Sequence, residues 1–178
     1  MATVYTLGHS TRELADFSRV LQTHEIRLLV DIRAFPASRR YPHFNREHLE
    51  LWLPEIGCDY LWEKDLGGRR KKQMPAEDSP NIALRNPSFR NYADYMLSAQ
   101  FQTAVERLVE EAKKRNTAIM CAEYVYFRCH RMLVSDYLVS QGHTGLHILD
   151  EKPPTPHQLS KDARIVDAKL VYRGDRLL

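Results

Sequence analysis

The feature that most constrains the fold is the alternation of short apolar segments with segments whose apolar residues recur at helical spacing. The apolar segments are rich in strand-forming residues and cover residues 3–8, 26–32, 57–62, 117–121 and 144–149. Apolar residues recur at helical spacing after residue 10 and again in residues 46–56, 88–115 and 128–141. Strands that alternate with amphipathic helices favour a mostly parallel sheet with helices on both faces.

We therefore expect one α/β domain over residues 1–178, with a mostly parallel, five-stranded sheet as the middle of three layers. A length of 178 residues is ordinary for one domain and short for two. Alternating apolar residues at 164–172 predict a further, peripheral strand near the C-terminus. The charged segment 64–87 has no period, so we expect a long mobile loop there, and three prolines mark 150–163 as a linker.

The start of the first helix has its own signal. Ser10 is followed three residues later by Glu13, and such a pair forms a capping box in which each side chain bonds the backbone N–H of the other residue. The sequence thus predicts a helix that begins at Ser10, with Leu14, Phe17 and Leu21 as its buried stripe.

Composition narrows the class of protein. Hydrophobic residues make up 43% of the chain and charged residues 28%, which is typical of a globular domain and argues against disordered and collagen-like chains. No apolar run is long enough to span a membrane, and the N-terminus lacks the pattern of a secretory signal. Three cysteines are too few, and odd in number, for a disulfide framework. We therefore expect a cytoplasmic protein that does not associate with membranes.

The net charge of +3 is unevenly distributed. Residues 33–46 contain four arginines and no carboxylate, residues 64–72 contain five basic residues and one acidic residue, and residues 124–131 contain two arginines and no acid. If these stretches meet on one side of the fold, they form a cationic mouth that attracts phosphates or other anions. The alternative is that each is a solvated loop on its own face.

Ligands of open parallel sheets bind beyond the carboxyl ends of the strands, and polar or reactive residues follow the predicted strands at that end. His9 and Ser10 follow the first strand, Asp31 and Arg33 lie at the end of the second, and Cys121 ends the fourth. We expect these groups to face one site.

Cys129 is the candidate nucleophile of that site. It lies at the predicted start of a helix, where backbone amides and neighbouring basic side chains favour the thiolate. A thiolate is a competent nucleophile, and the candidates for handling protons beside it are His9, Glu123 and His130. The alternative is a small buried residue at a helix start.

Arginine forks and nearby hydroxyls are the candidates for binding a phosphate or carboxylate, with Asp31 holding an arginine in place. The residues in question are Arg33, Arg39, Arg131, Ser10, Asp31 and Ser38. The alternative is that Asp31 pairs with Arg12 or Arg39 only to fix the loop.

The sequence requires no cofactor, and we expect no bound metal. The residues closest to a metal-binding pattern are Cys121, Cys129 and His147, but the spacing of the two cysteines is not that of a zinc knuckle. Packing is the expected role of Cys58 and Cys121, and His147 lies in an apolar strand, where a core position is expected.

Seven short motifs occur in order along the chain. They are Gly8-His9-Ser10-Thr11-Arg12, Leu29-Val30-Asp31-Ile32-Arg33, Leu66-Gly67-Gly68, Tyr92-Ala93-Asp94-Tyr95-Met96, Met120-Cys121-Ala122-Glu123, Cys129-His130-Arg131 and His147-Ile148. Together they resemble the DUF488 family over residues 3–172. The resemblance implies a compact α/β domain, found mainly in bacteria and archaea, without an assigned reaction. Members usually have a proline before the Cys-His-Arg motif, where this chain has Tyr124-Val125-Tyr126-Phe127.

Two functions follow as hypotheses. The first is a small enzyme with a reactive cysteine in a cationic pocket, acting on a phosphate-bearing substrate such as a nucleotide or a nucleic acid. The second is a non-catalytic nucleic-acid-binding module in which the cationic mouth grips the backbone and the cysteines only pack.

Overall fold

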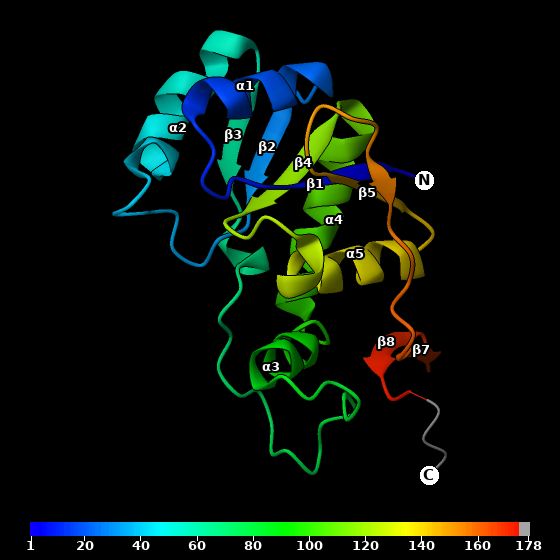
Figure 1. Ribbon diagram of the computed structural model, residues 1–178. Helices are drawn as coiled ribbons and strands as arrows, with labels where there is room; N and C mark the ends of the chain where they lie inside the picture. The colour runs from blue at the N-terminus through cyan, green and yellow to red at the C-terminus, as the bar shows by residue number, and fades with distance from the viewer. Residues whose placement is uncertain (175–178) are drawn as a thin grey trace.

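The computed structural model describes residues 1–174, and its centre is a six-stranded sheet in the order β3-β2-β4-β1-β5-β6 (Figure 1). Five strands are parallel, as the alternating sequence pattern predicts, and β6 joins β5 in antiparallel orientation. The strands are β1 (Thr3–Gly8), β2 (Leu28–Asp31), β3 (Asp59–Trp62), β4 (Thr117–Cys121), β5 (Thr144–Ile148) and β6 (Thr155–Pro156). The expected α/β class is therefore confirmed.

Helices cover both faces of the sheet (Figure 1). The α-helices are α1 (Leu14–Thr23), α2 (Arg46–Trp52), α3 (Pro87–Tyr95), α4 (Ala99–Lys114) and α5 (Arg131–Ser140). Phe17 of α1 and Leu49 of α2 pack in one apolar core with Leu29 of β2, while Phe101 of α4 and Leu133 of α5 belong to a second core. Two cores separated by one sheet make the three expected layers.

The register of the sheet aligns the carboxyl ends of β1, β2 and β4. Gly8 lies beside Cys121, and Asp31 lies beside Met120. Beyond the strands, the backbone N–H groups of His9 and Ser10 donate to the carbonyls of Cys121 and Ala122 at 3.0 and 2.9 Å. The segments that follow β1 and β4 are thus joined at the edge of the sheet where β2 also ends.

The predicted capping box at Ser10 is wrong. Ser10 has a left-handed backbone with φ of 49°, and α1 begins only at Leu14, with Glu13 as an N-cap that makes no side-chain capping bond. The Ser10 N–H is taken by the Ala122 carbonyl, so the chain is drawn across to β4 before the helix starts. A long-range bond to a neighbouring loop here outweighs a local capping preference.

The structure refines the prediction at the start of α5. The sequence predicts that helix from residue 128, but residues Tyr126–Arg128 form the short 3₁₀ helix η4 and α5 begins at Arg131. Cys129 is extended, with φ of −135°, and His130 is the N-cap. Cys129 therefore stands directly before the helix instead of in its first turn.

Near the C-terminus, the segment expected as one peripheral strand is a hairpin. Strands β7 (Ala163–Val166) and β8 (Lys169–Tyr172) pair antiparallel in a small second sheet. Asp167 and Ala168 connect them with φ of 49° and 62°, the left-handed pair that suits a tight two-residue hairpin turn. The segment 150–163, expected as a linker, contributes β6 to the main sheet.

The segment between β3 and α3 is mostly irregular and begins with the 3₁₀ helix η3 (Lys64–Leu66). It is fastened at its far end, where Ser79 Oγ and Asn81 Nδ2 both donate to Asp94 Oδ1 of α3 at 2.7 Å. Asn81 Oδ1 also accepts the backbone N–H of Tyr172. Two further 3₁₀ helices flank α2, namely η1 (Pro42–Phe44) and η2 (Leu53–Ile56). Within residues 1–174, no helix combines the length and apolar character needed to cross a bilayer.

Candidate functional site

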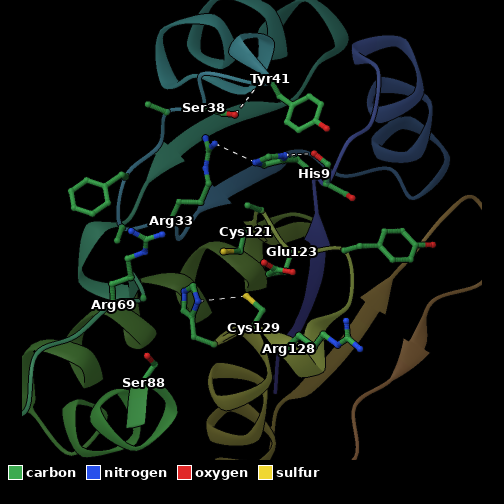
Figure 2. A pocket seen from close by; sticks show the side chains of 18 of the residues that line it. His9, Arg33, Ser38, Tyr41, Arg69, Ser88, Cys121, Glu123, Arg128 and Cys129 are labelled. Atoms are coloured by element: carbon green, nitrogen blue, oxygen red, sulfur yellow. Dashed lines mark hydrogen bonds between the residues drawn. The ribbon is translucent and has the colours of Figure 1, made fainter. Parts of the chain in front are cut away.

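A cavity of about 740 Å³ opens at the aligned carboxyl ends of β1, β2 and β4 (Figure 2). Its walls come from the loops after these strands and from the segment that precedes α5. Eight residues singled out from the sequence line it: His9, Ser10, Arg33, Ser38, Cys121, Glu123, Cys129 and His130. The topology thus gathers thiol, imidazole, guanidinium and carboxylate groups around one space.

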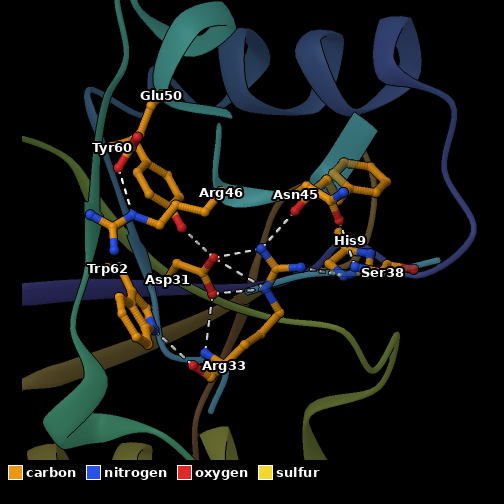
Figure 3. A network of polar contacts seen from close by, with 10 residues as sticks. His9, Asp31, Arg33, Ser38, Asn45, Arg46, Glu50, Tyr60 and Trp62 are labelled. Carbon is orange, nitrogen blue, oxygen red and sulfur yellow. Dashed lines mark hydrogen bonds and ion pairs between the residues drawn. The ribbon is translucent and has the colours of Figure 1, made fainter. Parts of the chain in front are cut away.

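Arg33 lines this cavity and is held in place by a network of hydrogen bonds (Figure 3). Its Nε and Nη2 donate to the carboxylate of Asp31, the shortest of these bonds being 2.6 Å, and Nη2 also donates to the Phe44 carbonyl at 2.7 Å. Tyr60 OH donates to the same carboxylate at 2.6 Å. Asp31 is fully buried and outside the lining, so it serves Arg33 and not a ligand.

His9 lies against Arg33 and is 3% exposed. Arg33 Nη1 can only donate, so His9 Nε2 accepts its N–H at 3.4 Å, and His9 Nδ1–H therefore donates to the Ser10 carbonyl at 2.9 Å. The ring also stacks on Phe44. Burial, together with the charge of Arg33, lowers the pKa of His9 to about 4. His9 is thus a neutral acceptor that orients the arginine.

Cys129 forms a thiol–imidazole pair with His130, and Figure 2 shows Cys129 on the side of the cavity opposite His9. Cys129 Sγ lies 3.5 Å from His130 Nδ1, and His130 Nε2 lies 2.9 Å from the Ile32 carbonyl oxygen. Because a carbonyl only accepts, Nε2 carries the proton, and Nδ1 is the nitrogen that exchanges a proton with the sulfur. The Arg131 backbone N–H also points to the sulfur at 3.5 Å. This is the geometry of a nucleophile, its base and a third group that orients the base.

Cys121, at the end of β4, completes this wall. Its sulfur lies within 4.8 Å of Cys129 Sγ, and interaction with the Cys121 thiol, aided by His130, holds the pKa of Cys129 well below the usual thiol range. The same interaction and burial raise the pKa of Cys121. The two cysteines are therefore unequal, and their surroundings favour the thiolate at Cys129.

Arg131 does not act as the anion clamp that the sequence predicted. Its side chain is 1% exposed and lies outside the cavity lining, with Nη2 donating to the carbonyls of Glu123 and Tyr124. These bonds hold the loop after β4 in place. Gly8 is required beneath this loop, because any Cβ there would overlap the Glu123 carbonyl. The Glu123 carboxylate, by contrast, lines the cavity.

Arg39 is also absent from the lining, although its neighbour Arg40 belongs to it. Two further arginines line the cavity, Arg69 and Arg128, so that four arginines face one carboxylate there. Arg40 and Arg69 belong to the basic stretches of the sequence, and these stretches indicated that arginines would line a site. The charge of a stretch does not indicate which of its arginines points into the cavity. No pattern in the sequence indicated that Tyr60 would be the second partner of Asp31.

His147 takes part in a different, buried network beneath β5. Thr6 Oγ1 lies 2.7 Å from His147 Nδ1, His147 Nε2 lies 2.8 Å from His157 Nδ1, and His157 Nε2 donates to Asp136 at 2.8 Å. Tyr126 stacks on the His147 ring with centroids 3.4 Å apart. Burial, together with the neighbouring His157, lowers the pKa of His147 to about 3. His147 is thus a core residue and does not join the cysteines.

Within residues 1–174, one group of three donor side chains could hold a metal ion, namely Cys121, Cys129 and His130, whose ligand atoms lie within 4.8 Å of one another. Two sulfurs and one imidazole nitrogen suit a soft or borderline cation such as zinc. His130 takes the place that the sequence analysis gave to His147.

Comparison with known proteins adds one finding. The family model described as "Domain of unknown function DUF488" matches residues 13–138. No curated protein and no solved structure gives a significant match.

Proposed function

This chain belongs to the DUF488 family, a domain of unknown function, and we propose an activity for it from its site. We propose an enzyme in which the Cys129 thiolate attacks a phosphate-bearing substrate, a nucleotide or the end of a nucleic acid, held by the arginines of the cavity. The observation that carries the proposal is the Cys129–His130–Ile32 arrangement facing an arginine-lined space.

The nucleophile is supported by its surroundings. A free thiol is a weak nucleophile at neutral pH because it is mostly protonated, with a pKa of about 8.5. Three groups surround the Cys129 sulfur: the Cys121 thiol, His130 Nδ1 and the Arg131 backbone N–H. Together they favour the thiolate before any substrate arrives.

The positive charge of the cavity indicates an anionic substrate. Four arginines line the cavity, and their guanidinium groups match the paired oxygens of phosphate. Arg33 uses four of its five N–H donors on Asp31, Phe44 and His9, and no described residue accepts the fifth. A fixed arginine with one N–H to spare is suited to a substrate oxygen, and Ser10 and Ser38 line the same space.

The reaction follows as a group transfer. The thiolate of Cys129 forms a bond to the electrophilic centre next to the bound phosphate, and the bond to the leaving group breaks. The proton on His130 Nδ1 passes to the departing group. Glu123, exposed at the cavity wall, then accepts a proton from the water that releases the product from Cys129.

Alkylation kinetics test this proposal. At pH 7, iodoacetamide should modify Cys129 roughly tenfold faster than a free cysteine. Inorganic phosphate or a nucleotide should slow the reaction by occupying the arginines. Cys58 serves as an internal standard, because burial raises its pKa to about 12.

Two adjacent arginines provide a matched pair of variants. Arg40→Ala should weaken protection by phosphate, whereas Arg39→Ala should not, because Arg40 lines the cavity and Arg39 is exposed outside it. If Cys129 reacts no faster than a free thiol, or if phosphate gives no protection, the enzyme proposal is wrong.

The second hypothesis, a nucleic-acid-binding module, is favoured by the aromatic side chains near the mouth. Phe35 and Tyr124 line the cavity and are exposed, Arg69 lies over the Phe35 ring at 6.0 Å, and Phe127 is 52% exposed. Exposed rings beside arginines suit stacked bases. A slow Cys129 combined with a steep salt dependence of nucleic-acid retention would favour the module.

A further inference from the structure

Cys121 and Cys129 lie close together in space, although the proposed group transfer uses only Cys129 as its nucleophile. Cys121 ends β4 and Cys129 follows η4, and their sulfur atoms lie within 4.8 Å of each other and of a ring nitrogen of His130. Both residues line the cavity, so a small reagent that enters the cavity meets both sulfurs.

Backbone contacts hold each of the two cysteines in place. Cys121 is fixed by pairing of β4 with β1, where it lies beside Gly8. Cys129 is fixed by its backbone N–H, which donates to the Tyr126 carbonyl, and by Met132 N–H, which donates to its carbonyl. A disulfide needs a sulfur–sulfur distance of about 2.05 Å. The two sulfurs, now within 4.8 Å of each other, must therefore move closer before the bond can form.

The surroundings of Cys121 and Cys129 differ in a way that suits two different roles in disulfide formation. An attacking thiol needs to be ionised, whereas a resolving thiol attacks the oxidised partner afterwards. His130 Nδ1 and the Arg131 backbone N–H each lie 3.5 Å from the Cys129 sulfur, so Cys129 is the cysteine placed beside a base. The Cys121 sulfur lies within 4.8 Å of Cys129 Sγ, close enough to act second.

We infer that Cys121 and Cys129 form a reversible disulfide when a hydroperoxide enters the cavity, with Cys129 as the oxidised residue and Cys121 as the resolving one. The inference rests on the Cys129 thiolate of the proposed function, but it also requires the Cys121 sulfur to form a bond, which group transfer does not. This disulfide cycle would give the protein a further activity, the reduction of a hydroperoxide with a dithiol as the reductant.

Oxidation by a hydroperoxide and reduction by a dithiol take three steps. The Cys129 thiolate attacks the terminal oxygen of the hydroperoxide, the O–O bond breaks, and the alcohol leaves with a proton from His130. Cys129 is then a sulfenic acid. The Cys121 sulfur attacks the Cys129 sulfur, the S–O bond breaks, and water leaves with the Cys121 proton. A dithiol restores both thiols by exchange and becomes a disulfide itself.

Thiol counting on the intact protein tests the inference. With one equivalent of hydrogen peroxide, the free thiols should fall from three to one, and dithiothreitol should restore all three. Peptide mass spectrometry should find Cys121 joined to Cys129 within one chain, lighter by two hydrogen atoms, with Cys58 still reduced.

The variant Cys121→Ser separates the two roles. It should leave Cys129 as a sulfenic acid that dimedone traps, whereas Cys129→Ser should abolish the reaction with peroxide. The inference is overturned if three thiols remain, if Cys129 passes to sulfinic acid while Cys121 stays free, or if the disulfide joins two chains. It is also overturned if the purified protein holds one equivalent of zinc that shields both thiols. Phosphate protection of a fast-reacting Cys129 together with any of the first three outcomes would leave the proposed function standing and reject the disulfide alone.

Discussion

His130 Nε2–H donates to the backbone carbonyl of Ile32 at 2.9 Å. The bond ties the N-cap residue of α5, which follows β4 in the chain, to the residue just beyond β2, the strand that neighbours β4 in the sheet. It also decides which ring nitrogen faces Cys129. The base of the candidate site is therefore oriented by the backbone of the sheet, without an acidic side chain.

The variant His130→Gln tests this orientation. The amide of the introduced glutamine can still donate to Ile32, but nothing replaces Nδ1 beside the Cys129 sulfur. We expect the pKa of Cys129 to rise and the rate of its alkylation at pH 7 to fall roughly tenfold or more, with little change in stability. The measurement is the pH profile of iodoacetamide labelling, and an unchanged profile would show that His130 does not support the thiolate.

Asp31→Asn should be strongly destabilising. It leaves the buried Arg33 guanidinium without an opposite charge, and breaking one side of a buried ion pair costs about 3–5 kcal/mol. Tyr60→Phe is the matched control, since it removes one hydrogen bond to the same carboxylate and should cost about 1 kcal/mol. Urea unfolding of both variants gives the comparison. Equal losses in the two variants would contradict the anchoring role of Asp31.

Gly8→Ala should displace the loop after β4. An added Cβ would overlap the Glu123 carbonyl, which Arg131 holds in place. Gly142→Ala is the control, because its Cβ meets nothing within 4 Å and its cost is limited to the positive φ of 82°, about 1 kcal/mol. We expect Gly8→Ala to lose more stability than the control and also to slow Cys129 alkylation. Normal alkylation in Gly8→Ala would mean that the loop does not position the thiol.

Stability should fall as the pH falls below about 6.5. The pKa of His9 is lowered to about 4 and that of His147 to about 3, so between these values and 6.5 the unfolded chain binds protons that the folded chain does not. At pH 5 each histidine should cost about 2 kcal/mol relative to pH 7.5. Urea midpoints across this range measure the slope. His9→Asn should make the slope shallower, and an unaltered slope in that variant would exclude a contribution from His9.

The alternation of apolar strands with amphipathic helices was enough to predict the parallel sheet and its two covered faces. Once the sheet is parallel, the carboxyl ends of its strands meet at one edge, and for this reason His9, Arg33, Cys121 and Cys129 could be assigned to one site from the chain alone. Periodicity decides which face a strand residue occupies, because successive side chains of a strand alternate between faces.

Only the tertiary structure decided what the loop residues do. Arg131 turns inward because the Glu123 and Tyr124 carbonyls accept its hydrogen bonds, and Ser10 leaves the helix because the Ala122 carbonyl takes its N–H. His147 joins Thr6 and His157 instead of the cysteines. Each outcome depends on partners from distant parts of the chain. The direction of a polar side chain in a loop is set by whichever acceptor the fold brings near, and no local pattern contains that information.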